Sequence, residues 1–253
     1  MTARVAVFKF ASCDGCQLSV LDAEDDLLAI VGAVDIVEFP EARTLREPGP
    51  YDVGLVEGSI TTPHDAKRIR EIREQCKVLV TIGACATSGG IQALRNMADV
   101  GGYASIVYAH PEYLDVLAQS TAISDHVPVD LALFGCPVSK EQLVETITAV
   151  VAGRRPDLPA HSVCVECKAR GTVCVLVANG TPCLGPVVRA GCGAICPSYA
   201  RGCYGCFGPC ASPNVASLAT AWDAAGVPKA TLVRTLQGFT VGAPEFQEAV
   251  RAL

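Results

Sequence analysis

The stretch KVLVTIGAC, residues 77–85, decides the class of fold. Residues 77–82 form a nearly continuous apolar run, and Gly83 and Cys85 follow closely behind it. A strand without alternating polar residues is typical of a parallel sheet that helices cover on both faces. The stretch therefore predicts a buried central strand that ends beside Cys85.

Strands of the same kind are expected around this one, and helical patterns separate them. The expected strands are residues 4–10, 34–39, 52–56 and 130–134, and the expected helices are residues 17–30, 65–75 and 141–152, with short ones near 92–96 and 112–120. Alternating strands and helices predict an α/β fold built on a flavodoxin-like parallel sheet. We place this domain at residues 1–155, because the composition changes after the sequence GRRP at residues 153–156.

Four cysteines are placed at the ends of these strands. Cys13 and Cys16 follow the first strand, Cys85 the fourth and Cys136 the fifth. Because open parallel sheets bind ligands outside the carboxyl ends of their strands, we expect the four thiols to converge at one edge. The sequence predicts a four-thiolate metal site there. Cys76 lies between a helix and a strand instead, and we interpret it as a small core residue.

A second group of cysteines lies in residues 164–206, among many glycines and prolines. This composition disfavours long helices and strands and favours a backbone that wraps closely around a bound group. Eight soft thiolates are enough for two further four-cysteine sites. We place this cysteine-rich domain at residues 156–253, with short helices at 214–225, 230–236 and 244–253. Its eight cysteines are Cys164, Cys167, Cys174, Cys183, Cys192, Cys196, Cys203 and Cys206.

Local charge favours iron–sulfur clusters in these sites. The whole chain has a net charge of −6, yet residues 164–206 carry four cations (Lys168, Arg170, Arg189 and Arg201) against the single anion Glu166. Cations and backbone N–H groups lower the free energy needed to bury an anionic cluster. Zinc is the alternative, because structural zinc also binds four cysteines in C-x-x-C pairs. Zinc ribbons pair their knuckles across a β-hairpin, however, and this stretch has few strand-like runs beyond residues 173–178.

Two other side chains near these sites are expected to be spectators. His161 stands three residues before Cys164 and could offer a nitrogen ligand, but four cysteines are already at hand. Cys210 follows the last C-x-x-C pair and is expected not to be a ligand.

Length and composition exclude several classes of protein. The chain has 253 residues, 14 of them cysteines, and half of its residues are apolar. The acidic net charge gives no sign of nucleic-acid binding, and no apolar run approaches the length of a membrane helix. The first ten residues read as a strand and not as a signal peptide, so we expect a cytoplasmic protein without disulfides. Few charged residues also indicate that another subunit covers part of the surface.

These separated motifs resemble the small subunit of nickel–iron hydrogenases. The sequences SCDGC (12–16), VEGS (56–59), GAC (83–85) and GCP (135–137) carry this resemblance. The sequences CLGP (183–186) and RGCYGC (201–206) are similar to the cytoplasmic, NAD(P)-linked branch often called sulfhydrogenases. Small subunits of complex I are less similar, because they have adjacent cysteines in place of the first C-x-x-C pair and lack the second half.

The resemblance implies three 4Fe–4S clusters and no catalytic residue in this chain. Hydrogen would be split at a nickel–iron centre of a large subunit, and electrons would pass to diaphorase subunits that hold iron–sulfur clusters, FAD and NAD(P). Alternatives are a hydrogenase linked to a deazaflavin or to a heterodisulfide reductase, or, from another class, a non-catalytic zinc-binding interaction protein. The implied ligands are Cys13, Cys16, Cys85 and Cys136 for a proximal cluster, Cys192, Cys196, Cys203 and Cys206 for a medial one, and Cys164, Cys167, Cys174 and Cys183 for a distal one.

Overall fold

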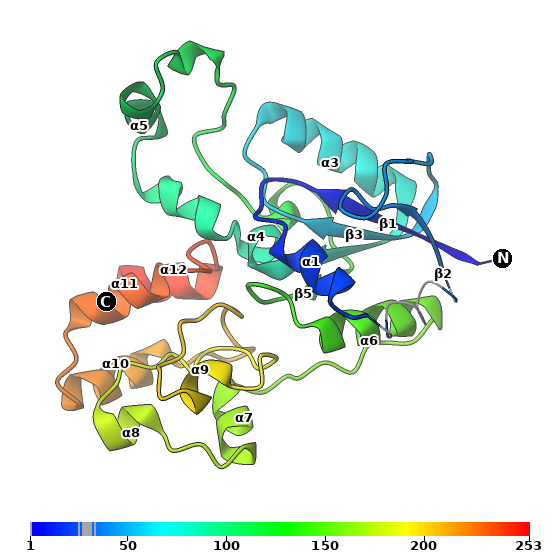
Figure 1. Ribbon diagram of the computed structural model, residues 1–253. Coiled ribbons are helices and arrows are strands. Elements are labelled where there is room, and N and C mark those ends of the chain that lie inside the picture. The colour runs from blue at the N-terminus through cyan, green and yellow to red at the C-terminus, as the bar shows by residue number, and fades with distance from the viewer. Residues whose placement is uncertain (1, 25, 27–31, 33) are drawn as a thin grey trace.

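A five-stranded parallel sheet organises the first half of the chain (Figure 1). The computed structural model describes residues 2–24, 26, 32 and 34–253. The strand order is β2-β1-β3-β4-β5, which is the order of flavodoxin-like folds. The predicted α/β class is therefore confirmed. The strands are β1 (Ala3–Lys9), β2 (Val34–Glu38), β3 (Tyr51–Glu57), β4 (Cys76–Ile82) and β5 (Leu131–Leu133), each within three residues of its predicted bounds.

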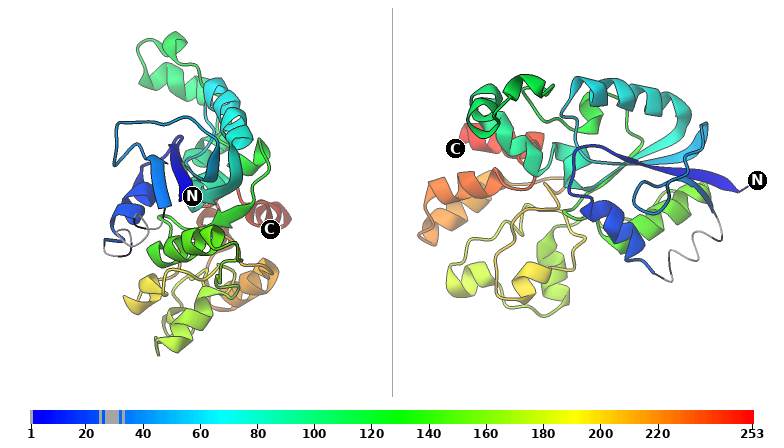
Figure 2. Two further views of the ribbon diagram at one scale, coloured as in Figure 1. Left: turned by 90° about the vertical axis from the view of Figure 1, so that its right-hand side faces the viewer. Right: turned by 45° about the horizontal axis from the view of Figure 1, so that its top comes forward.

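Helices cover both faces of the sheet, as the apolar strands require. Helices α1 (Gly15–Leu21) and α6 (Lys140–Val151) lie on one face, and α3 (Pro63–Gln75) lies on the other (Figures 1 and 2). Each face has its own buried apolar cluster, with Val20 and Ile147 in one and Ile69 and Ile72 in the other. The Thr62 hydroxyl caps α3 by accepting the Asp65 N–H at 3.1 Å.

Three local predictions differ from the structure. The helix predicted for residues 17–30 ends at Leu21, and its residues 25 and 27–30 lie outside the described residues. Residues 112–120 form no helix beyond the short 3₁₀ turn η2 (Pro111–Tyr113), whereas α5 (Val100–Val107), which was not predicted, stands away from the sheet (Figure 1). The strand-like run at 173–178 is mostly helical, as α8 (Val175–Asn179), because none of the five strands in the described part of the chain lies beside it to pair with.

Short helices lead from the sheet to its edge. Helix α4 (Gly83–Ser88) begins directly where β4 ends, and the 3₁₀ helix η1 (Ile91–Met97) follows it. The 3₁₀ helix η3 (Ile123–Asp125) precedes β5 and packs against α4.

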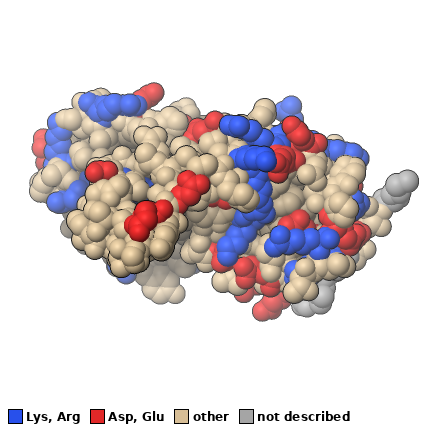
Figure 3. Space-filling view, turned by 90° about the horizontal axis from the view of Figure 1, so that it is seen from above, with Lys and Arg blue, Asp and Glu red and all other residues tan. Residues whose placement is uncertain are grey.

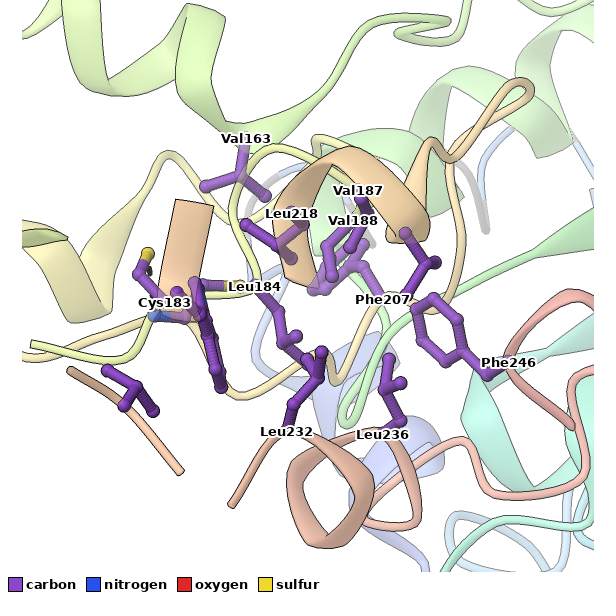
Figure 4. Packing of buried hydrophobic residues seen from close by; sticks show 14 of the residues in the cluster. Val163, Cys183, Leu184, Val187, Val188, Phe207, Leu218, Leu232, Leu236 and Phe246 are labelled. Atoms are coloured by element: carbon purple, nitrogen blue, oxygen red, sulfur yellow. Dashed lines mark hydrogen bonds between the residues drawn. The ribbon is translucent and has the colours of Figure 1, made fainter. Parts of the chain in front are cut away.

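The second half of the chain has a core of its own. Trp222 and Phe246 are each 1% exposed, and Leu184 and Phe207 pack with them (Figure 4). Each large apolar side chain buried in this way stabilises the fold by roughly 1.5–3 kcal/mol. The helices of this second half are α7 (Val163–Ala169), α8, α9 (Ile195–Ser198), α10 (Val215–Ala224), α11 (Lys229–Leu236) and α12 (Pro244–Ala252). Among the described residues, no helix is both long enough and apolar enough to cross a membrane.

Candidate metal centres

The first four cysteines meet at the place where the strand order reverses. Strands β1 and β3 are neighbours, but the chain leaves them toward opposite sides of the sheet, which creates a crevice at their carboxyl ends. Cys13 and Cys16 follow β1, while Cys85 lies in α4 directly after β4, and Cys136 follows β5. All four cysteines therefore lie in segments at the carboxyl edge of the sheet.

Burial and mutual charge raise the pKa values of thiols in this set. Burial raises the pKa of the Cys16 thiol, and charge on Glu57, Cys85 and Cys136 raises it further. Burial likewise raises the pKa of Cys85 to about 11, with contributions from Cys136 and Cys13. Clustered buried thiols of this kind are protonated unless a cation compensates their charge.

Gly83 allows α4 to lie this close to α1. Its φ is +83°, and a Cβ added there would lie 2.3 Å from the Sγ atom of Cys16. The Ala84 N–H donates to the Gly135 carbonyl at 2.7 Å, which ties the loop of Cys136 to the helix of Cys85. A side chain at position 83 would separate these elements.

Three polar residues support this set, and the sequence patterns did not assign them a role. Glu57 is 1% exposed, and its carboxylate accepts the Cys16 N–H at 3.0 Å and the Gln17 side-chain amide at 2.7 Å. Burial raises the pKa of Glu57, and these two hydrogen bonds oppose that shift. Gln92 donates to the Ala11 carbonyl at 3.0 Å, and its side chain lowers the pKa of the Cys85 thiol. The motif VEGS was the available signal for Glu57, whereas Gln17 and Gln92 had none.

A second set gathers around α7. Burial raises the pKa of Cys164 to about 11, and charges on Cys183, Cys167 and Cys174 add to the shift. The Lys168 ammonium lowers that pKa. These are the four cysteines that the resemblance assigns to one outer site.

A third set lies between the other two. Burial raises the pKa of Cys206 to about 12, and charges on Cys192 and Cys196 add to it. Burial also raises the pKa of Cys203, which charges on Cys183, Cys206 and Cys192 raise further. Cys203 thus has neighbours in its own set and one in the set around α7.

Direct contacts join the three sets in a row. Cys136 of the first set lines one cavity together with Cys192, Cys196 and Cys206 of the third, and the ring of Phe207 lies against both Gly135 and Gly191. At the other end, the Cys203 N–H donates to the Sγ atom of Cys183 at 3.2 Å. Gly202 permits this crossing, because a Cβ there would lie 1.7 Å from the Pro182 carbonyl oxygen.

The remaining residues considered as ligands lie apart from the sets. Cys76 is buried, and its Sγ atom packs over Gly54 of the neighbouring strand. Cys210 is buried in the second half of the chain and lies near Arg189, whose pKa it raises. His161 is exposed and contacts the Ser162 carbonyl at 3.2 Å.

Over the part of the chain that the structure describes, no three His, Cys, Asp or Glu side chains form a group that could hold a single metal ion.

Comparison with a family model places the first half of this chain among known proteins. Residues 13–150 match the family described as NADH ubiquinone oxidoreductase, 20 Kd subunit. The match ends at the last turn of α6, and it leaves the cysteine-rich half uncovered.

Relatives that extend over more of the chain are subunits of hydrogenases. The sulfhydrogenase 2 subunit delta of Pyrococcus furiosus is 36% identical over 84% of this chain and 89% of its own length. One subunit of the F420-non-reducing hydrogenase vhu of Methanocaldococcus jannaschii is 33% identical over 82% of each chain. Among solved structures, a chain of an NAD+-reducing [NiFe]-hydrogenase is 28% identical with a TM-score of 0.58, and the match covers 63% of this chain and 96% of that one.

Proposed function

Because this chain belongs to the nickel–iron hydrogenase small subunits within the 20 kDa NADH ubiquinone oxidoreductase family, we propose that it is the electron-transfer subunit of a reversible hydrogenase. In this role it carries electrons between a large subunit and a flavin-containing NAD(P) module. The observation that supports this most is the unbroken row of three four-cysteine sets.

Each set would hold one 4Fe–4S cluster. Cys13, Cys16, Cys85 and Cys136 would bind the proximal cluster, Cys192, Cys196, Cys203 and Cys206 the medial one, and Cys164, Cys167, Cys174 and Cys183 the distal one. When bound, such clusters supply one-electron redox chemistry. The protein would hold them in order and set their potentials through hydrogen bonds, burial and charge. Hydrogen chemistry would take place in the large subunit, so no residue of this chain is proposed as catalytic.

The surface near the proximal set supports the presence of a partner. Helix α5 has no buried residue, and Ile106 and Val107 are 81% and 68% exposed. Tyr103 and Tyr108 are also exposed, so several large apolar side chains of this arm face outward together. In Figure 3 charged side chains are densest on the right and more scattered on the left, the side of the α5 arm in Figure 1. Exposed apolar side chains gathered in this way are typical of a face that another subunit covers. We propose the large subunit as that partner, because the α5 arm continues from the helix that carries Cys85.

The electron acceptor is the finer part of the proposal. We propose diaphorase subunits with iron–sulfur clusters, FAD and NAD(P), by analogy with the NAD+-reducing neighbour. A heterodisulfide-reductase-linked or deazaflavin-linked hydrogenase is the second candidate, and the relative named F420-non-reducing speaks against deazaflavin as the acceptor in that protein. Copurification followed by assays with NADP, NAD, deazaflavin and ferredoxin separates these acceptors. A cytoplasmic location and a division into domains 1–155 and 156–253 complete the proposal.

Metal analysis of the purified complex tests the proposal directly. We expect about 12 Fe and as many sulfides for this chain, counted after subtracting the partner subunits' share, and paramagnetic signals of three interacting clusters after reduction. A colourless chain with zinc would show instead the non-catalytic zinc-binding interaction protein. Four iron atoms in this chain would contradict the two outer clusters.

A further inference from the structure

One acidic side chain lies between the medial and the distal cysteines. Glu166 is in α7, between Cys164 and Cys167 of the distal set. Its Oε1 atom accepts the Gly191 N–H at 2.9 Å, and its Oε2 atom accepts the Ala194 N–H at 3.1 Å. These two N–H groups flank Cys192 of the medial set, so a single carboxylate of the distal helix holds the medial loop on both sides.

A cation directly after this helix binds a carbonyl group of the same loop. The Nη1 atom of Arg170, the C-cap residue of α7, donates to the Gly193 carbonyl at 2.5 Å. Residues 191–194 therefore have two N–H groups and one carbonyl bound by α7 and its C-cap. Ala194 has a φ of +54°, which is unfavourable for a residue with a Cβ, so contacts from the surroundings must maintain this shape.

Glu166 is the only anion in residues 164–206. Its negative charge raises the pKa of one thiol in each of the two sets. Burial raises the pKa of Cys192, the N–H groups of Ala194 and Ile195 lower it, and charge on Glu166 raises it. The charge of Glu166 also raises the pKa of Cys167. An anion between two anionic clusters is electrostatically unfavourable, so a positional role must offset this disadvantage.

We propose that Glu166 and Arg170 form a clamp that sets the spacing of the medial cysteine loop from the distal helix, and thereby the electron-transfer step between these two sites. They are positioning residues that touch no substrate. The inference rests on the proposed function, because the clamp matters for electron flow only if both sites hold clusters. The structural part, that α7 fixes residues 191–194, stands on the hydrogen bonds alone.

Substitutions in the full hydrogenase complex test the clamp. In Glu166→Gln one amide oxygen replaces two carboxylate oxygens, so at least one N–H loses its acceptor. Charge-assisted hydrogen bonds of this kind change an opening equilibrium by about 10- to 100-fold, so amide exchange of Gly191 and Ala194 should accelerate by that factor. We also expect a changed magnetic interaction between the two reduced outer clusters and slower reduction of an external acceptor. The large subunit's exchange of hydrogen gas with deuterium needs no outer cluster. This gas exchange should therefore stay at the wild-type rate.

Two further variants keep the test decisive. Arg170→Gln is at an exposed position and removes only the bond to Gly193, so it should produce the same changes more weakly even if Glu166→Gln fails to fold. Glu248→Gln removes an exposed carboxylate of α12 and should leave every readout at its wild-type value. Unchanged amide exchange and an unchanged spectrum in both clamp variants would overturn the clamp. A wild-type complex without iron in this chain would overturn the proposed function instead, while amide exchange would still decide whether α7 holds the loop.

Discussion

The Glu57 carboxylate accepts the backbone N–H of Cys16 at 3.0 Å, across the crevice between β1 and β3. Its second oxygen accepts the Gln17 side-chain amide at 2.7 Å. The end of β3 is thus tied to the first turn of α1, and with it to the Cys16 thiol of the first set.

This pair predicts a local effect of Glu57→Gln. The amide can accept one of the two donors and opposes the other with its own N–H₂ group. We expect the free energy of unfolding to fall by about 1.5–3 kcal/mol, the usual range for hydrogen bonds to a charged group. Where the carboxylate is ionised, its loss should also raise the potential of the proximal cluster, by roughly 40 mV for each kcal/mol of lost repulsion. Denaturant unfolding and redox titration measure the two effects. Glu38→Gln, at another buried carboxylate of the sheet, is the control and should leave the potential unchanged.

Gly83→Ala should damage the first set specifically. The added Cβ would lie 2.3 Å from the Cys16 Sγ atom, and the φ of +83° adds backbone strain. We expect loss of one cluster, from about 12 to about 8 Fe. Gly153→Ala is the matched control, because Gly153 has a φ of +68° and nothing within 4 Å of an added Cβ. Equal iron contents in the two variants would show that steric room beside Cys16 is irrelevant.

Cys76 and Cys85 should respond differently to substitution, although both lie within the ten residues 76–85. Cys85→Ser removes a member of the first set and should lower the iron content together with the proximal signal. Cys76→Ala removes a sulfur that packs over Gly54, so it should reduce stability by about 1 kcal/mol and keep all iron. Iron analysis with thermal unfolding distinguishes the two, and iron loss in Cys76→Ala would contradict its role as a core residue.

Asp52 predicts a pH-dependent contribution to stability. Its carboxylate accepts the Lys77 ammonium at 2.6 Å and the Arg4 N–H at 2.8 Å, and these hydrogen bonds lower its pKa. A lowered folded-state pKa means that the contribution is present above the unfolded value near about 3.9 and is lost as the pH falls through the folded value. Because Asp52 is partly exposed, we expect Asp52→Asn to lower the free energy of unfolding by only about 1 kcal/mol at neutral pH. The difference from wild type should disappear in acid, whereas exposed Asp115→Asn should show no such trend. A constant difference at all pH values would exclude the ion pair as its cause.

Most of the sheet could be predicted from residue patterns, because buried parallel strands are uniformly apolar and need no long-range information to recognise. The α5 arm could not be predicted in the same way. Its residues are apolar but mostly exposed, so their pattern reflects no core within this chain. The helix α8 was misread for a related reason. Valines favour strands, yet a strand forms only where a neighbour offers hydrogen bonds, and the sheet is elsewhere.

The sequence by itself determined the fold class, the order of strands and helices, and the twelve cysteines proposed as ligands, because apolar runs and soft-ligand chemistry are local properties. Only the tertiary structure decided which thiols lie beside one another. The reversal of strand order brings Cys13, Cys16, Cys85 and Cys136 to one edge of the sheet, Cys136 and Cys206 line one cavity, and the Cys203 N–H donates to Cys183. It also decided the hydrogen bonds of Glu57 and Glu166, because a carboxylate finds its N–H donors only when segments far apart in the chain have been brought together.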